Sequence, residues 1–278
     1  MLEGDASGFR DLRNAVRAGL AVQFVVENEH VAGSEQTFAA MMNEQASRLG
    51  MVNSHFENAT GLPGQNHYSS ARDLALLAQA VIKDFPEYYR WDSQKEFTYN
   101  NITQKNRNLL LWRDESVDGL KTGYTEDAGY CMVASAKRED MRLISVVMGT
   151  SSPIARANES QSLLNYGFRF FETHKLYEAG KQLTEARVRK GETSNLTVGL
   201  AEDLYVTAPR RHFNELKAET EIDKAILAPI NKGDTVGTLK VTLAGESIVN
   251  TPLVALDSIP EGGFFRRLYD AVLVLLER

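Results

Sequence analysis

The hydrophobic period changes once along this chain, and this change constrains the fold more than any other feature. Before about residue 172, apolar residues recur mainly at helical spacing, with some continuous apolar runs typical of buried strands. From Gln182 to Leu256, about six or seven short runs alternate apolar and polar residues between turn signals. A chain of 278 residues can hold two cores. We therefore expect a mixed α/β domain followed by a small all-β sandwich.

Two helices of the first domain are indicated by their caps. Ser34 is the expected cap of the first helix, which ends at Gly50. Ser70 and Asp73 resemble a capping box that opens the second helix, and Pro86 marks the end of that segment. The faces expected to pack into the core are Phe38, Met41, Met42, Ala46 and Leu49 in the first helix and Leu74, Leu77, Ala78 and Val81 in the second.

Two apolar runs predict the central strands of the first domain. Residues 129–136 and 141–149 are separated by a charged turn, which favours an antiparallel pair joined as a hairpin. Upstream of them, Phe97, Tyr99 and Ile102 alternate like one further strand. Residues 157–171 predict a third helix, with an apolar face of Leu163, Leu164, Tyr166, Gly167 and Phe170.

The tripeptide Lys121-Thr122-Gly123 stands just ahead of the first of these runs and has the chemistry of a carboxylate-binding edge. A lysine ammonium can hold a carboxylate, and a threonine hydroxyl can donate a hydrogen bond to the same group. Glycine has no Cβ, so an extended peptide can approach the strand and pair with its edge. A surface turn is the alternative interpretation of the same three residues.

The composition indicates no nucleic-acid, cofactor or metal chemistry. The net charge is −6, and no basic stripe with interleaved aromatic residues offsets it. The histidines lack metal-ligand spacing, and no glycine-rich phosphate motif is present. Cys131 is the single cysteine, which excludes an intrachain disulfide and a cysteine-rich metal site. We expect it to be a small buried hydrophobe.

Residues 261–278 predict an amphipathic helix at the carboxyl end. The helix is too short to cross a bilayer and suits a position in the plane of the lipid headgroups. A helix docked on the protein, or a dimer contact, fits the pattern alone equally well. The side chains expected to face a membrane are Phe265, Leu268, Tyr269, Val272, Leu275 and Leu276.

Several stretches carry a family pattern in a fixed order. They are residues 30–34, 42–43, 48–51, 70–75, 106–110, 117–123, 140–147, 167–172 and 261–265. Together they resemble the low-molecular-mass penicillin-binding proteins that act as D-alanyl-D-alanine carboxypeptidases. The resemblance implies a penicillin-recognising, serine-transferase-like α/β (α+β) domain, a β-rich carboxyl domain and a terminal helix. In the family, that helix anchors the protein to the periplasmic face of the inner membrane.

The resemblance also implies a serine-type peptidase that removes the terminal D-Ala from peptidoglycan stem peptides through an acyl-enzyme. The implied partners are stem peptides ending in D-Ala-D-Ala, β-lactams and the membrane surface. Lys121, Thr122 and Gly123 would hold the terminal carboxylate, and Arg156 would be a second contact. The alternative for Arg156 is a solvent-facing position at a helix start. A β-lactamase uses the same tripeptide, but the β-rich carboxyl domain and the terminal helix argue against one.

The family's Ser-x-x-Lys and Ser-x-Asn motifs do not occur in this sequence. Residues 1–28 are atypical for the family and lack the features of a secretory signal. Three accounts are open: a fragment with an incomplete first domain, a pseudoenzyme that binds peptidoglycan or a membrane without cleaving, or another nucleophile such as Ser69 or Ser70. We predict a carboxypeptidase by descent that is inactive as written. The expected divisions are a partial peptidase domain at 1–172, a β-sandwich at 173–260 and a membrane-anchoring helix at 261–278.

Overall fold

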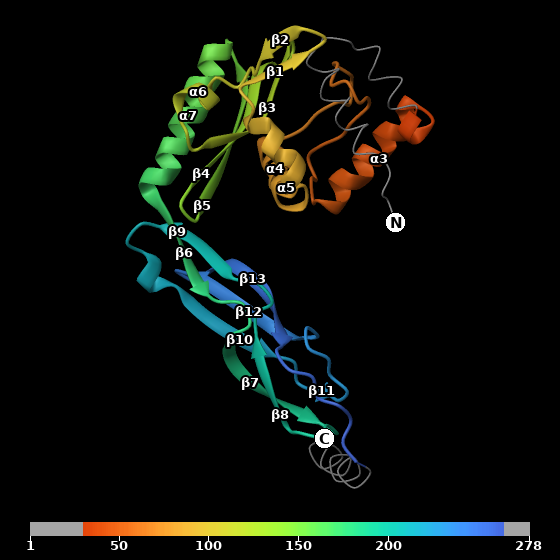
Figure 1. The fold of residues 1–278 in the computed structure, drawn as a ribbon, viewed down its shortest axis with the longest axis vertical. Helices are drawn as coiled ribbons and strands as arrows, with labels where there is room; N and C mark the ends of the chain where they lie inside the picture. Colours follow the sequence, from red (N-terminus) through yellow and green to blue (C-terminus); the bar gives the residue numbers. More distant parts are fainter. Residues whose placement is uncertain (1–29, 264–278) are drawn as a thin grey trace. The chain divides into compact units, whose positions relative to one another are not determined.

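The computed structural model describes residues 30–263, which form two compact units that divide between Arg169 and Phe170 (Figure 1). The atypical amino end and nearly all of the predicted terminal helix, including its six predicted membrane-facing side chains, lie outside the described residues. Within 30–263, no helix combines the length and the hydropathy that a membrane span requires.

The first unit is built on a three-stranded antiparallel sheet in the order β3-β4-β5. The strands are β3 (Val117–Thr125), β4 (Gly129–Arg138) and β5 (Met141–Thr150). The predicted hairpin of β4 and β5 is confirmed, and Glu139 in its turn has a φ of 52°. Figure 1 shows α7 (Pro153–Phe170) on one face of the sheet and α4 (Ala71–Asp84) with α5 (Pro86–Tyr89) on the other. The sheet is therefore the middle layer of this unit.

The two predicted helix caps are confirmed, but the capping box is not. The Oγ of Ser34 accepts from the N–H of Thr37 at the start of α3 (Glu35–Arg48), and the Oγ of Ser70 accepts from the N–H of Asp73. The carboxylate of Asp73 does not return to the cap. It is fully buried and accepts from the N–H of Asn53 and the hydroxyl of Ser54 instead. The Asp73 carboxylate therefore contacts the preceding loop, and sequence spacing alone does not predict this contact.

Some side chains predicted to be core are exposed. The buried residues of α7 lie on one side of the helix. The other apolar residues that were predicted to face the core lie on its other sides. This correction applies to Met41 in α3, to Leu77 in α4, and to Leu163, Tyr166 and Phe170 in α7. The helix α7 also begins at Pro153, four residues before the predicted start. Proline suits the first helical turn, and the Oγ of Ser152 accepts from the N–H of Ala155 there.

The segment predicted as one strand near Tyr99 is a two-stranded hairpin. Its strands are β1 (Glu96–Tyr99) and β2 (Ile102–Lys105), which pair antiparallel. Asn100 and Asn101 form the turn with φ of 48° and 61°. Asparagine tolerates this conformation better than most residues, so the Asn-Asn pair was the signal for the turn. Short helical turns complete the unit at η1 (Arg90–Ser93) and α6 (Leu110–Arg113).

The second unit is all-β. One sheet pairs β6 (Phe171–Tyr177) with β9 (Leu204–Pro209), and a six-stranded sheet has the order β10-β12-β13-β8-β7-β11. Strands β7 to β13 confirm the seven runs at the upper end of the prediction. A core that includes Leu196, Leu239 and Leu253 supports the unit. The strands of the larger sheet are β7 (Gln182–Arg189), β8 (Asn195–Gly199), β10 (Lys217–Ile222), β11 (Ile226–Leu227), β12 (Thr235–Leu243) and β13 (Glu246–Ala255).

Candidate substrate-binding site

The tripeptide Lys121-Thr122-Gly123 lies inside β3, the strand directly ahead of β4, as its predicted position before the first apolar run requires. Its residues pair with Val133, Met132 and Cys131 of β4, so the surface-turn interpretation is wrong. In the described sheet, β3 is an outer strand that pairs with β4 alone. The tripeptide therefore lies on a strand with one unpaired edge, the geometry that β-strand addition of a peptide needs.

Lys121 and Gly123 share one face of β3 because side chains alternate along a strand. Both are exposed, and Thr122 between them is half-buried. The ammonium of Lys121 donates a hydrogen bond to the backbone carbonyl of Thr122. A Cβ placed on Gly123 would meet no atom within 4 Å. The space beside Gly123 is therefore open, as the approach of a ligand backbone requires.

A partly buried network positions the start of β3, three residues before Lys121. Arg142 of β5 contacts both carboxylate oxygens of Asp118 at 2.8 Å, one through a hydrogen bond and the other through an ion pair. The same guanidinium donates to the hydroxyl of Ser135 at 2.6 Å, and the phenol of Tyr89 donates to Asp118. Burial and the bond to Asp118 raise the pKa of Tyr89 well above its usual value. The phenol is therefore a neutral donor at any physiological pH, and the network is fixed.

Gly119 makes the close approach between this network and β3 possible. A Cβ at this position would lie 2.8 Å from the ring of Tyr89. Its carbonyl accepts a 3.0 Å hydrogen bond from the side-chain amide of the fully buried Asn108. Asn108 also accepts from the N–H of Leu110. The segment ahead of α6 is thereby tied to β3.

Arg156 is buried, with 5% of its surface exposed, so the alternative interpretation, a solvent-facing position at a helix start, is wrong. Its Nη1 donates to the carbonyl oxygen of Gly123 at 3.0 Å and lies 3.5 Å from that of Cys131. Its guanidinium carbon lies 5.5 Å from the centre of the Tyr130 ring. Burial, and then the positive charge of Arg107, lower the pKa of Arg156. From α7, this side chain braces the last residue of the tripeptide.

Cys131, opposite Gly123, is half-buried and not buried as predicted. Its thiol lies 3.4 Å from the carbonyl oxygen of Ala128, a weak hydrogen bond back into the turn before β4.

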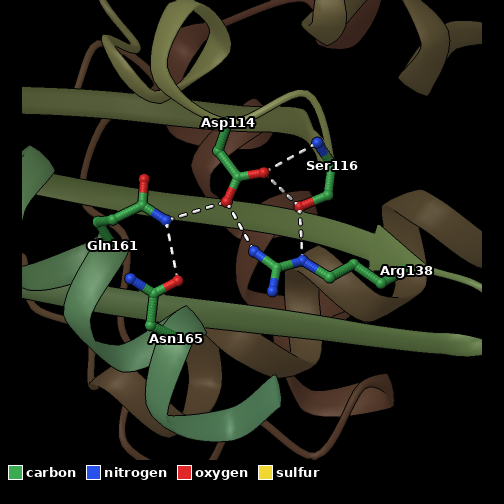
Figure 2. Close-up of polar contacts among 5 residues, drawn as sticks. All are labelled: Asp114, Ser116, Arg138, Gln161 and Asn165. Carbon is green, nitrogen blue, oxygen red and sulfur yellow. Dashed lines mark hydrogen bonds and ion pairs between the residues drawn. The ribbon is translucent and has the colours of Figure 1, made fainter. Parts of the chain in front are cut away.

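A second polar cluster joins the approach to β3 with β4 and α7 (Figure 2). One oxygen of Asp114 accepts from the N–H and hydroxyl of Ser116, at 2.9 and 2.6 Å. The other accepts from Arg138 at 2.9 Å and Gln161 at 3.0 Å. Burial acts to raise the pKa of Asp114, but these hydrogen bonds and the charge of Arg138 outweigh it and lower the pKa to about 2. Asn165 extends the cluster by accepting from Gln161. No local sequence pattern indicates this cluster.

The proposed substitute nucleophiles have no basic partner in the described part of the chain. Ser70 caps α4. The hydroxyl of Ser69 lies 2.8 Å from that of Ser54, which donates to the carboxylate of Asp73. Within residues 30–263, neither serine hydroxyl makes a hydrogen bond to a lysine or histidine. Among residues 30–263, no group of His, Cys, Asp or Glu side chains could hold a metal ion.

Comparison with known proteins identifies the family. The D-alanyl-D-alanine carboxypeptidase family profile matches residues 23–152. The profile of the penicillin-binding protein 5 C-terminal domain matches residues 171–261. The chain is 45% identical over 248 residues to the D-alanyl-D-alanine carboxypeptidase DacC of Escherichia coli, and covers 62% of that protein with 88% of its own length. It is 38% identical over 275 residues to DacD of the same organism, covering 70% of DacD with 96% of its own length.

A crystal structure of penicillin-binding protein 5 from Haemophilus influenzae superposes with a TM-score of 0.77 at 40% identity. That match covers 91% of this chain and 74% of the other. The chain thus spans less than two thirds of DacC but most of DacD and of the crystallised protein. With both family profiles matched in order, this chain belongs to the D-alanyl-D-alanine carboxypeptidase family of low-molecular-mass penicillin-binding proteins.

Proposed function

We propose that this chain binds peptides ending in D-alanyl-D-alanine along the unpaired edge of β3. The observation that carries the proposal is the placement of Lys121-Thr122-Gly123 on that edge, with open space beside Gly123. Main-chain hydrogen bonds to the strand supply affinity without regard to sequence. The ammonium of Lys121 and the hydroxyl of Thr122 select a free carboxylate. β-Lactams, which imitate such a peptide in the family, are the second proposed ligand class.

The network around Asp118 and the brace from Arg156 support this role. They hold β3 at Gly119, just before the tripeptide, and at Gly123, its last residue. A strand that is already ordered loses little conformational entropy when a peptide pairs with it. The proposed edge is therefore organised before any ligand arrives.

The relatives of this chain are named as carboxypeptidases. Peptide cleavage in this family proceeds through an acylated serine. The 278 residues contain no Ser-x-x-Lys and no Ser-x-Asn. We propose that the chain as written binds the peptide without hydrolysing it. A covalent intermediate needs a nucleophile beside a base, and within the described part of the chain neither Ser69 nor Ser70 has a basic partner. This assignment makes the chain a non-catalytic peptidoglycan-binding relative of the carboxypeptidases, and an active carboxypeptidase with another nucleophile is the alternative.

Intact-mass measurement after incubation with a penicillin tests catalysis. We expect no mass gain on folded protein, together with reversible binding of the penicillin that Lys121→Ala weakens. The matched control is Lys137→Ala, which removes an exposed strand lysine from the neighbouring β4. A penicilloyl adduct that survives denaturation and disappears in Lys121→Ala would show a substitute nucleophile and an active enzyme. Equal loss of binding in both variants would contradict the role of the tripeptide.

We also propose a location at the periplasmic face of an inner membrane. The proposed domains are residues 1–172, 173–260 and 261–278. The predicted amphipathic pattern of the last segment supports them. Flotation with vesicles of anionic and zwitterionic lipid provides the measurement. We expect the full chain to float and a Leu268→Asp, Leu275→Asp variant to remain in the dense fraction. Equal flotation of both proteins would contradict the proposed anchor.

A further inference from the structure

Tyr124 presents an exposed aromatic ring at the end of the tripeptide. It follows Gly123 directly in β3, and 54% of its surface is exposed. Its ring stacks on that of Tyr130, with the ring centres 4.2 Å apart and the ring planes 29° apart. The two residues are cross-strand partners in β3 and β4, so they share one face of the sheet. The stack fixes the ring of Tyr124, and more than half of the residue stays accessible to a ligand.

The supporting residue Tyr130 is itself held in place. Its carbonyl oxygen accepts a 2.9 Å hydrogen bond from the hydroxyl of Thr150 in β5. The guanidinium carbon of Arg156 lies 5.5 Å from the centre of its ring, and the same guanidinium donates to the carbonyl of Gly123. One buried side chain therefore contacts both the strand beside Tyr124 and the ring that supports it. A ring that is ordered in advance binds a ligand at a smaller cost in conformational entropy.

The surroundings of β3 favour one direction for a bound peptide. At Gly119, the backbone carbonyl is bonded to Asn108 and a Cβ would lie 2.8 Å from an aromatic ring, so the amino end of the strand is crowded. At Gly123, a Cβ would meet no atom of the described chain within 4 Å. A peptide whose carboxylate is held by the tripeptide therefore extends towards Tyr124. Such a peptide runs antiparallel to β3.

We propose that Tyr124 is a specificity-determining residue that packs against the side group third from the carboxyl end of the bound peptide. This inference rests on the proposed function, because it assigns a further contact to the same ligand. Antiparallel pairing places the terminal residue opposite Thr122, the next residue opposite Gly123 and the third residue opposite Tyr124. Directly opposed side chains lie on the same face, with their Cβ atoms about 4.5–5.5 Å apart. The preferred ligand is then a peptide with a large apolar side group directly ahead of D-Ala-D-Ala.

Binding of a matched peptide pair to the full chain tests the inference. The probes are acetyl-L-Phe-D-Ala-D-Ala and acetyl-L-Ala-D-Ala-D-Ala, which share charge and length and differ only in the third side group. Titration calorimetry gives the ratio of their affinities for each protein. We expect wild type to prefer the phenylalanyl peptide about fivefold, as for one aromatic contact. Tyr124→Ala should bring this ratio close to one, and Tyr124→Phe should preserve it because the ring remains.

Tyr99→Ala is the matched control, because it removes another exposed tyrosine of the first unit, in β1. A loss of preference confined to Tyr124→Ala supports the inference. If Tyr124→Ala keeps the preference, if Tyr99→Ala loses it equally, or if Tyr124→Phe loses it too, the inference is overturned. If wild type binds both peptides equally and Lys121→Ala weakens both, this inference falls and the proposed function stands. A wild type that binds neither peptide overturns the proposed function and this inference with it.

Discussion

At the scale of single residues, charged and polar side chains fix the approach to β3. Asp118, a residue of β3, binds the phenol of Tyr89 and the guanidinium of Arg142. Asp114 joins the loop before β3 to β4 and α7. Each carboxylate satisfies several donors at once, which is the condition for placing an ionised group in a partly buried position. Truncating one such carboxylate leaves its donors unpaired, so the effect exceeds the value of one contact.

Asp114→Asn tests the second of these carboxylates through the pH dependence of stability. The folded pKa of about 2 lies below the model-peptide value of 3.8, so ionised Asp114 stabilises the fold above pH 4. That contribution falls as the pH drops from about 4 to about 2. We expect Asp114→Asn to lower the free energy of unfolding by about 1–2 kcal/mol at pH 7, since part of the cluster is solvent-screened.

Urea unfolding at several pH values provides the measurement for Asp114→Asn. The difference from wild type should shrink towards zero near pH 2. Asp127→Asn, which removes an exposed carboxylate from the β3–β4 turn, should change the stability little at any pH. A pH-independent loss in Asp114→Asn would mean that the carboxylate charge is not the cause.

Two glycines of β3 make a matched pair. Gly119→Ala places a Cβ 2.8 Å from the Tyr89 ring, and we expect it to lower the free energy of unfolding by about 1–3 kcal/mol. Gly123→Ala meets open space, so its stability should stay within about 0.5 kcal/mol of wild type. The new methyl group should instead weaken peptide binding, because it occupies the proposed ligand approach. Thermal melts and peptide titration of both variants separate the two roles, and the reverse pattern would contradict them.

At the scale of elements, local patterns predicted the caps of α3 and α4 and the β4–β5 hairpin. They failed where a distant segment decides the outcome. Asp73 fits a capping box by spacing, yet the loop at Asn53 and Ser54 takes its carboxylate. The network of Tyr89, Asp118 and Arg142 joins positions far apart in the chain, so no local signal reports it. The start of α7 and the β1–β2 turn did have local signals, Ser152-Pro153 and Asn100-Asn101. A prediction from the hydrophobic period alone misses both signals.

The different tasks of Ser70 and Asp73 give a prediction for α4. Ser70→Ala removes one cap bond from the helix and should lower the free energy of unfolding by about 1 kcal/mol. Asp73→Ala leaves the donors of Asn53 and Ser54 unpaired beside a fully buried position, which should lower it by about 2–3 kcal/mol or more. Urea titrations of the two variants give the comparison. Equal losses would favour a reciprocal capping box, which the structure does not contain.

At the scale of the whole molecule, the two units have separate cores and different architectures. The first is a sheet between helices, and the second is all-β with a core of its own strands. The candidate site is contained in the first unit. The sequence indicates this organisation because a change of hydrophobic period is a long-range property that survives local errors. It does not indicate which unit limits the stability of the chain.

The positions of the tryptophans allow the stability of each unit to be followed separately. Both tryptophans, Trp91 and Trp112, lie in the first unit, so their fluorescence reports its unfolding alone. Leu239 is almost fully buried in the core of the second unit, and Leu239→Ala should destabilise that unit by about 2–5 kcal/mol. We expect this variant to shift the circular-dichroism transition to lower urea while leaving the fluorescence transition in place. Leu164→Ala, in the buried face of α7, should move the fluorescence transition instead. If Leu239→Ala moves both transitions equally, the two units unfold as one cooperative body, and ligand binding at β3 would then stabilise the whole chain and not the first unit alone.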